Sequence, residues 1–388
     1  MNKVTFLFLV CSGVLSYGQQ SHSGIVLTLD GGEPLEFVSV FNITDHTMTN
    51  EDGRFQFSSQ IDSVFFYTPG YEKLKTTFSA LRDTIYLQKN IVNLDEVVIT
   101  NAKTILDRIR DSIGINYLLS PHTETFFIRA LLRRNDTIMR LQDMYGNLRR
   151  KTSVYAGELE LEKKDYEVEL LQMRQVGIKK DKNNVYFIFP SFFDIFSEFV
   201  RINAMGPDFD VIEKPLENTN EIRVEFSPSK ADVSGGSSGS YIINALDNAI
   251  LSFEVSTKRI IAEPIRQRPE YHGPILLESA TYFTKDKGND RYFMNYGKRK
   301  IIVESKTKDQ KEPTKFQIEI LLHTTNPFSQ LDLKSNVNEQ KDVFTLKSPY
   351  NETFWKSQNQ LLLTEEMLKF ITNLAEDNKE FKVKSNLD

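Results

Sequence analysis

The chain has 388 residues and a formal net charge of −5, and 40% of its residues are hydrophobic. This length predicts two or three domains, and the nearly balanced charge argues against nucleic acid as a partner. The only cysteine is Cys11, which excludes intramolecular disulfides and thiolate metal sites.

Residues 1–18 have the features of a signal peptide. Lys3 supplies a positive start, and residues 4–15 form an apolar run that is too short to span a bilayer. Ser16 and Gly18 provide small residues at the expected cleavage site. We therefore expect export, with cleavage after residue 18. No later stretch has the roughly 18 apolar residues of a transmembrane helix, so none is expected in the mature chain.

Residues 22–90 predict a small β-sandwich. Short apolar stretches alternate with turn residues at a spacing of about 8 to 12 residues, which is typical of such domains. The expected strands are residues 24–29, 35–43, 54–57, 63–68, 72–78 and 83–87.

The stretch MTNEDGRFQF, residues 48–57, predicts a tight turn. A calcium loop with Gly53 at its sixth position would need a carboxylate at Met48 and a glutamate at Ser59. Both are missing. Asn50 can bond to its own backbone and Gly53 can adopt a positive φ, so a turn explains the pattern.

Residues 24–92 resemble the carboxypeptidase-regulatory-like domain, through the T-x-E-D-G-x-F turn, the Pro-Gly-Tyr corner at 69–71 and LDEVVIT at 94–100. The resemblance implies a seven-stranded Greek-key or immunoglobulin-like sandwich without catalytic residues. Such domains are common in envelope proteins of Gram-negative bacteria. It therefore implies the periplasm or the periplasmic face of the outer membrane, and an envelope protein as partner.

After a linker at 91–101, residues 102–388 predict a larger antiparallel β-rich domain with flanking helices. Ile105, Ile109 and Ile113 mark one apolar face of a first helix, and Thr364 can cap a last helix that reaches about Asn378. The expected strands are residues 125–134, 137–151, 220–228, 239–245, 250–257, 274–283, 291–305 and 315–325. The paired stretches at 220–230 and 239–257 resemble periplasmic half-barrels such as lipoprotein carriers.

No motif predicts an enzyme, a cofactor or a metal site. The five histidines lack metal-ligand spacing, so each is expected on the surface or in a turn. GGSSG at 235–239 matches a nucleophile motif around Ser237, but its Gly/Ser content favours a flexible connection between strands. The acidic pairs Glu51/Asp52 and Glu365/Glu366 lie in polar contexts that do not raise a carboxyl pKa.

Residues 185–200 are rich in aromatic side chains. Phe189, Phe192, Phe193 and Phe196 have helical spacing, and Pro190-Ser191 near its beginning predicts a helix start. Two interpretations remain open. The four side chains fill the core of the half-barrel, or they line a cavity for an apolar ligand or touch lipid.

Three functions are compatible with this sequence. The favoured one is a non-catalytic binding or assembly module of the cell envelope. The second is a carrier of an acyl chain or another apolar ligand in a half-barrel cavity, and the third is a hydrolase, which the missing motifs disfavour. The sequence leaves the ligand, the partner, the oligomeric state and attachment to the outer membrane open.

Overall fold

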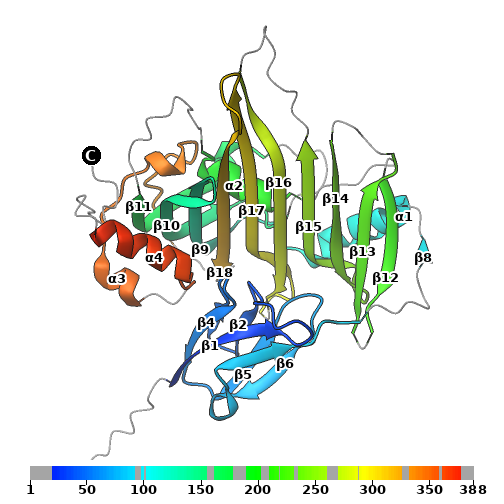
Figure 1. Cartoon of the computed structure of the whole chain (residues 1–388). Coiled ribbons are helices and arrows are strands. Elements are labelled where there is room, and N and C mark those ends of the chain that lie inside the picture. Colours follow the sequence, from blue (N-terminus) through cyan, green and yellow to red (C-terminus); the bar gives the residue numbers. More distant parts are fainter. Residues whose placement is uncertain are drawn as a thin grey trace, which may run out of the picture. The chain divides into compact units, whose positions relative to one another are not determined.

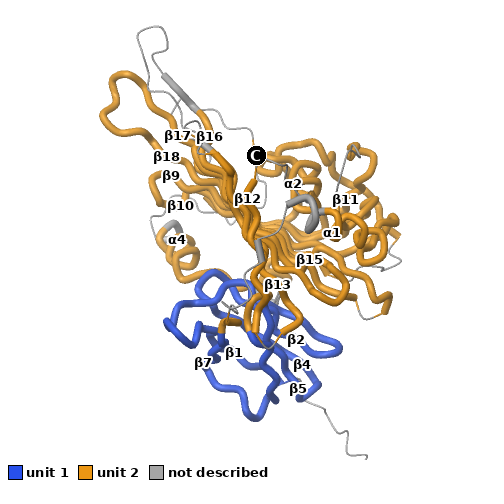
Figure 2. Tube along the Cα trace, turned by 90° about the vertical axis from the view of Figure 1, so that its right-hand side faces the viewer, with its two compact units in different colours: residues 1–68, 72–88 blue, residues 69–71, 89–388 orange. Residues whose placement is uncertain are grey.

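The computed structural model describes residues 20–91, 98–99, 102–154, 161–177, 189–201, 209–217, 219–230, 235–259, 270–286, 288–325, 332–357 and 361–376. The expected signal peptide and most of the expected linker lie outside these ranges. Contacts divide the chain into two units, residues 1–68 with 72–88 and residues 69–71 with 89–388 (Figure 2). Both units are mainly β, as the sequence predicted.

The first unit is a sandwich of seven strands in two sheets. One sheet has the order β4-β1-β7, with β1 antiparallel to β4 and parallel to β7. The other has the order β3-β2-β5-β6 and is antiparallel. The strands are β1 (Gln20–Thr28), β2 (Ser39–Phe41), β3 (His46–Met48), β4 (Arg54–Ser59), β5 (Ser63–Tyr67), β6 (Leu74–Thr77) and β7 (Thr84–Leu87).

A core between the two sheets holds the sandwich together. Phe55 of β4 and Phe66 of β5 are fully buried and meet edge to face, with ring centroids 5.3 Å apart. Val26, Val38 and Val64 are also fully buried, so both sheets contribute to one hydrophobic core.

The tight turn predicted at residues 48–57 is confirmed. The side-chain oxygen of Asn50 accepts the backbone N–H groups of Asp52 (3.0 Å) and Arg54 (2.9 Å). Gly53 has φ +72°, and a Cβ there would lie 2.6 Å from the carbonyl oxygen of Val26. A side chain at this position is therefore excluded both by backbone conformation and by space.

The second unit contains one antiparallel sheet with the strand order β11-β10-β9-β18-β17-β16-β15-β14-β13-β12-β8 (Figure 1). Strand β18 pairs with both β17 and β9, so it joins β9 to β11 to the later strands in one sheet. The strands are β8 (Val98–Ile99), β9 (His122–Arg134), β10 (Thr137–Arg150), β11 (Tyr166–Gly177), β12 (Phe209–Pro215), β13 (Glu221–Pro228), β14 (Gly235–Asn244), β15 (Ala249–Arg259), β16 (Glu270–Lys285), β17 (Tyr292–Thr307) and β18 (Thr314–Thr325).

Helices lie on both faces of this sheet. Figure 1 shows α1 (Ala102–Asn116) and α2 (Phe192–Phe199) behind the strands and α4 (Glu365–Glu376) in front of them. The short helix α3 (Glu352–Ser357) precedes α4 and was not predicted. In β9, Phe126 and Ile128 belong to the core under α2, whereas Leu131 packs with Met367 of α4. This division follows from the alternation of side chains along a strand.

The segment with α3 and α4 is held to the sheet by buried charges. Arg129 donates to both carboxylate oxygens of Asp143 (2.8 and 3.0 Å) and to the carbonyl oxygens of Leu361 and Leu362. Arg174 also donates to Asp143 (2.6 and 2.8 Å). Burial would raise the pKa of Asp143, but the two arginines outweigh it and lower that pKa. Asp143 therefore stays ionised and pairs with both arginines.

No helix within the described ranges is long and apolar enough to cross a membrane. The last predicted helix is confirmed as α4, and the Thr364 hydroxyl accepts the N–H of Met367 (3.2 Å) as an N-cap. Strands β11 and β12 were not predicted from the sequence.

Candidate functional site

The aromatic stretch forms helix α2, which begins at the residues that the sequence indicated. Ser191 is the N-cap, and its hydroxyl accepts the N–H of Asp194 (3.2 Å). The Asp194 carboxylate in turn accepts the N–H of Ser191 (2.9 Å), which completes a capping box. Tyr186 and Phe187 lie outside the described residues.

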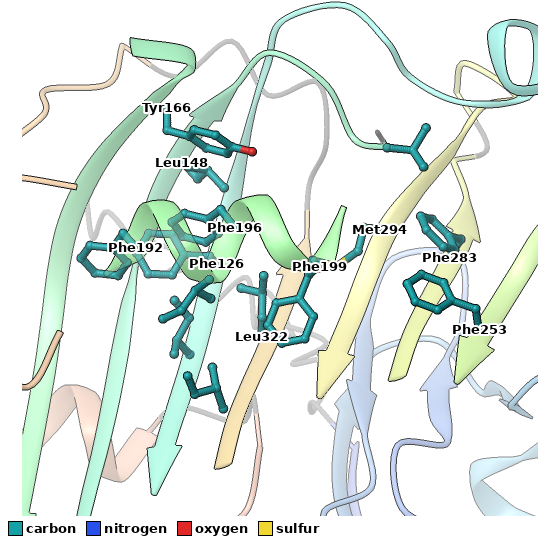
Figure 3. Close-up of a cluster of buried hydrophobic side chains, with 14 of the residues drawn as sticks. Phe126, Leu148, Tyr166, Phe192, Phe196, Phe199, Phe253, Phe283, Met294 and Leu322 are labelled. Atoms are coloured by element: carbon teal, nitrogen blue, oxygen red, sulfur yellow. The ribbon is translucent and has the colours of Figure 1, made fainter. Parts of the chain in front are cut away.

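The side chains of α2 pack against the sheet at β9, β10 and β11 (Figure 3). Phe192 and Phe196 are fully buried, and both meet Phe126 of β9 edge to face at 5.7 and 5.4 Å. Phe193 is half-buried and meets Tyr166 of β11. Phe189 is buried against Phe344 at 4.3 Å. These contacts place Phe189, Phe192 and Phe196 in the packed core and Phe193 at its edge.

A cavity of about 330 Å³ lies beyond the end of α2, over strands β13 to β17. This volume falls in the range of about 300–1,000 Å³ that is usual for small-molecule pockets. Its apolar lining consists of Phe209, Phe226, Phe253, Val255 and Leu277. Its polar lining consists of Glu198, Arg201, Ser237, Thr257, Ser279 and Arg299. Phe189, Phe192, Phe193 and Phe196 are not among these residues.

The floor of the cavity includes a row of residues that crosses five strands, and all of the row except Gly239 lines the cavity. Phe226, Gly239, Val255, Ser279 and Arg299 are direct cross-strand partners in that order. Paired residues point to the same face of a sheet, so this row presents one continuous surface. Four strand spacings of about 4.8 Å give the row a length of roughly 19 Å.

The row changes in character from one end to the other. At the β13 end, Phe226 meets Phe209 edge to face at 5.9 Å. Gly239 leaves space for the Phe226 ring, because a Cβ on Gly239 would lie 2.7 Å from its Cζ. At the β17 end the row finishes on the Arg299 guanidinium. The cavity is therefore aromatic at one end and cationic at the other.

The last turn of α2 forms the boundary of the cavity. Phe199 packs on Gly297 of β17, where a Cβ would lie 2.4 Å from the ring carbon Cδ1. Glu198 Oε2 and Arg299 Nη1 form an ion pair at 3.2 Å. Arg201 follows the helix and also lines the cavity. With two arginines and one glutamate, the lining carries a formal charge of +1.

A second group of ionisable residues is buried at the end of β9 and β10. Arg150 and Glu124 pair at 2.7 Å, and His122 Nε2 lies 3.8 Å from the Glu124 carboxylate. Burial raises the pKa of Glu124 to about 7 although Arg150 acts in the opposite direction. Burial and the Arg150 charge lower the pKa of His122 to about 4. These three residues do not line the cavity.

Two expectations about chemistry need correction. The histidines were expected on the surface or in turns, but His122 and His323 are buried in β9 and β18. The GGSSG stretch was expected to be a flexible connection, but it is part of strand β14 and pairs with residues 255–259 of β15. Cross-strand neighbours hold it: Ser237 and Thr257 share a hydrogen bond of 2.8 Å. A strand is not the strained elbow that a nucleophilic serine requires.

Within the described ranges, no group of three or more His, Cys, Asp or Glu side chains could hold a metal ion. The acidic pair at the start of α4 has a simple structural role. Glu365 and Glu366 are in the first turn of α4, and Glu366 forms an ion pair with Arg133.

Comparisons with known proteins assign no family. No protein-family model matches the chain, and no curated protein matches it. Among solved structures, it is similar to the crystal structure of a DUF1329 family protein from Desulfovibrio piger, with 9% identity and a TM-score of 0.27. The match covers 60% of this chain and 95% of that one. At this TM-score we draw no conclusion from the likeness.

Proposed function

We propose that this chain is a non-catalytic binding protein of the cell envelope whose large domain holds an apolar ligand. The observation that carries this proposal is the cavity of about 330 Å³ over β13 to β17. Its wall includes three phenylalanines, and apolar pockets with a few polar groups are the usual form of small-molecule sites.

The cellular location in this proposal comes from the sequence. Residues 1–18 have the features of a signal peptide, and residues 24–92 resemble a domain that is common in Gram-negative envelope proteins. An exported protein with an apolar cavity is suited to bind a molecule that dissolves poorly in water. This favours ligand binding over a purely structural role.

The cavity can be filled by one substitution on its floor. Ser279 is half-buried on β16 and is the direct partner of Val255. Ser279→Trp places an indole ring in the cavity. Ser256→Trp on β15 is the matched control, because Ser256 is also half-buried but points to the opposite face of the sheet.

The test uses the full chain and the neutral fluorescent probe N-phenylnaphthylamine. We expect the probe to bind with increased fluorescence, and Ser279→Trp to weaken binding about tenfold or more, which corresponds to about 1.4 kcal/mol. Ser256→Trp should bind as the unmodified chain does. Absence of probe binding, or equal binding by both variants, would show that this cavity is not a ligand site.

A further inference from the structure

The cationic end of the cavity is built around Arg299. Its Nη1 pairs with Glu198 at 3.2 Å. Its side chain lines the cavity and keeps 21% of its surface exposed, so the guanidinium can be reached from the cavity. A guanidinium binds a carboxylate or phosphate best through two parallel N–H bonds, and the single contact with Glu198 leaves that capacity unused. Arg299 therefore offers a donor to an anionic group inside the cavity.

The opposite end of the cavity is mainly aromatic and aliphatic. Phe226 and Phe209 close it at β13 and β12, and Phe253 and Val255 continue the apolar surface along the floor. The row between Phe226 and Arg299 runs across the sheet, because it consists of one residue on each of five neighbouring strands. The volume of the cavity, near the lower limit of small-molecule pockets, suits a ligand with one apolar chain rather than two.

We infer that the cavity binds a single-chain amphiphile with an anionic head, a carboxylate or a phosphate. The head lies against Arg299, and the apolar chain follows the floor toward Phe226. This inference rests on the proposed function and adds the chemical class of the ligand. Glu198 competes with the anionic head for the guanidinium and therefore weakens binding.

The experiment measures displacement of N-phenylnaphthylamine from the full chain by amphiphiles that share one chain length. The set comprises dodecanoate, dodecyl phosphate, neutral dodecanol and cationic dodecyltrimethylammonium, each below its micelle concentration. We expect an anion to bind about tenfold to hundredfold more tightly than dodecanol, the range for hydrogen bonds to charged groups. The cation should bind more weakly than dodecanol.

Substitutions then test the role of Arg299. Arg299→Gln should remove the preference for the anions and leave dodecanol affinity within about twofold, since the floor is otherwise unchanged. Lys300→Gln is the matched control: it removes the same charge from the next residue of β17, which points to the other face and pairs with Glu278. Glu198→Gln should increase the affinity for both anions.

The outcomes separate the two proposals. Equal displacement by dodecanoate, dodecyl phosphate and dodecanol would overturn the anionic head and leave the apolar cavity intact. An anion preference that survives Arg299→Gln would overturn the assignment to Arg299. A chain that does not bind the probe or any amphiphile would contradict the proposed function itself.

Discussion

The two halves of the large sheet differ in how their faces are covered. Strands β9 to β11 carry the aromatic side chains of α2 on one face and the α3–α4 segment on the other. Over β13 to β17, α2 reaches only as far as Phe199 on Gly297, and a cavity begins there. The sheet is a filled core under the helix, and beyond its end the sheet borders a cavity, while Tyr241, Ile250 and Phe283 remain in the hydrophobic core. Where α2 ends therefore decides where the cavity begins.

The largest expected effect is on the free energy of unfolding, when a Phe→Ala substitution is made in each half and the two losses are compared. Phe196→Ala removes a fully buried ring between Phe126 and Tyr166 and should lower the free energy of unfolding by about 3–5 kcal/mol. Phe209→Ala removes a half-buried ring of the cavity wall. It should cost at least about 1 kcal/mol less, since a partly exposed side chain has fewer contacts to lose.

Urea unfolding followed by the fluorescence of Trp355 measures both losses, because Trp355 is the only tryptophan and belongs to the large domain. Equal losses for the two variants would show that the half with the cavity is packed as tightly as the half under α2.

The second prediction concerns the buried charges in the filled half and the dependence of stability on pH. Glu124 has a folded-state pKa of about 7 against 4.5, so the folded chain binds the extra proton and stability falls as pH rises through that window. His122 has a pKa of about 4 against 6.5, so the unfolded chain binds the extra proton and stability rises with pH from about 4 to 6.5. The two effects largely cancel in the unmodified chain.

Single substitutions should reveal each effect. Between pH 4.5 and 6.5, Glu124→Gln should become more stable with rising pH, and His122→Gln less stable, each by roughly 3 kcal/mol at most. Urea unfolding at several pH values measures the slopes. Slopes of the same sign in both variants would refute the assignment of opposite pKa shifts.

The smallest expected effect lies at the boundary between the halves. Gly297→Ala forces Phe199 away from β17, and such overpacking costs about 1–3 kcal/mol. It should also weaken probe binding, since the end of α2 borders the cavity. Gly114→Ala is the control, because Gly114 lies in α1 with nothing within 4 Å of an added Cβ and should gain up to about 1 kcal/mol. A silent Gly297→Ala, in thermal or urea unfolding, would mean that Phe199 does not fix the boundary.

Local signals in the sequence were sufficient for helix α2 and the Gly53 turn. Phe192 and Phe196 follow helical spacing, and Ser191 is a capping residue directly before them. Asn50 and Gly53 similarly define their turn through their own backbone. In each case the residues that determine the conformation are neighbours in the chain.

Long-range pairing explains what the sequence did not reveal. The GGSSG stretch has the composition of a loop. It is nevertheless a strand, and Gly239 fits there because the β15 backbone and the Phe226 ring leave no space for a Cβ. His122 is buried because β10 and β11 bring Arg150 and Tyr166 beside it. The row on the cavity floor contains one residue from each of five strands. These residues come together only through the register of strand pairing, which the sequence does not show. The one local signal was in β15, where Phe253, Val255 and Thr257 alternate with the polar residues Glu254 and Ser256.

The position of β18 also has a consequence for how the large domain assembles. Its partners on β9 are 182 residues away in sequence at Arg134 and Phe316 and 200 away at Thr125 and Thr325. During synthesis, strands β9 to β11 are complete at Gly177, long before β18 (Thr314–Thr325), whereas β17 directly precedes β18. Closing so long a segment is entropically unfavourable, and sheets rich in such distant pairs fold slowly, on the order of milliseconds to seconds. Until residue 325 is available, the facing edges of β9 and β17 lack their shared partner and are open to pairing with other chains.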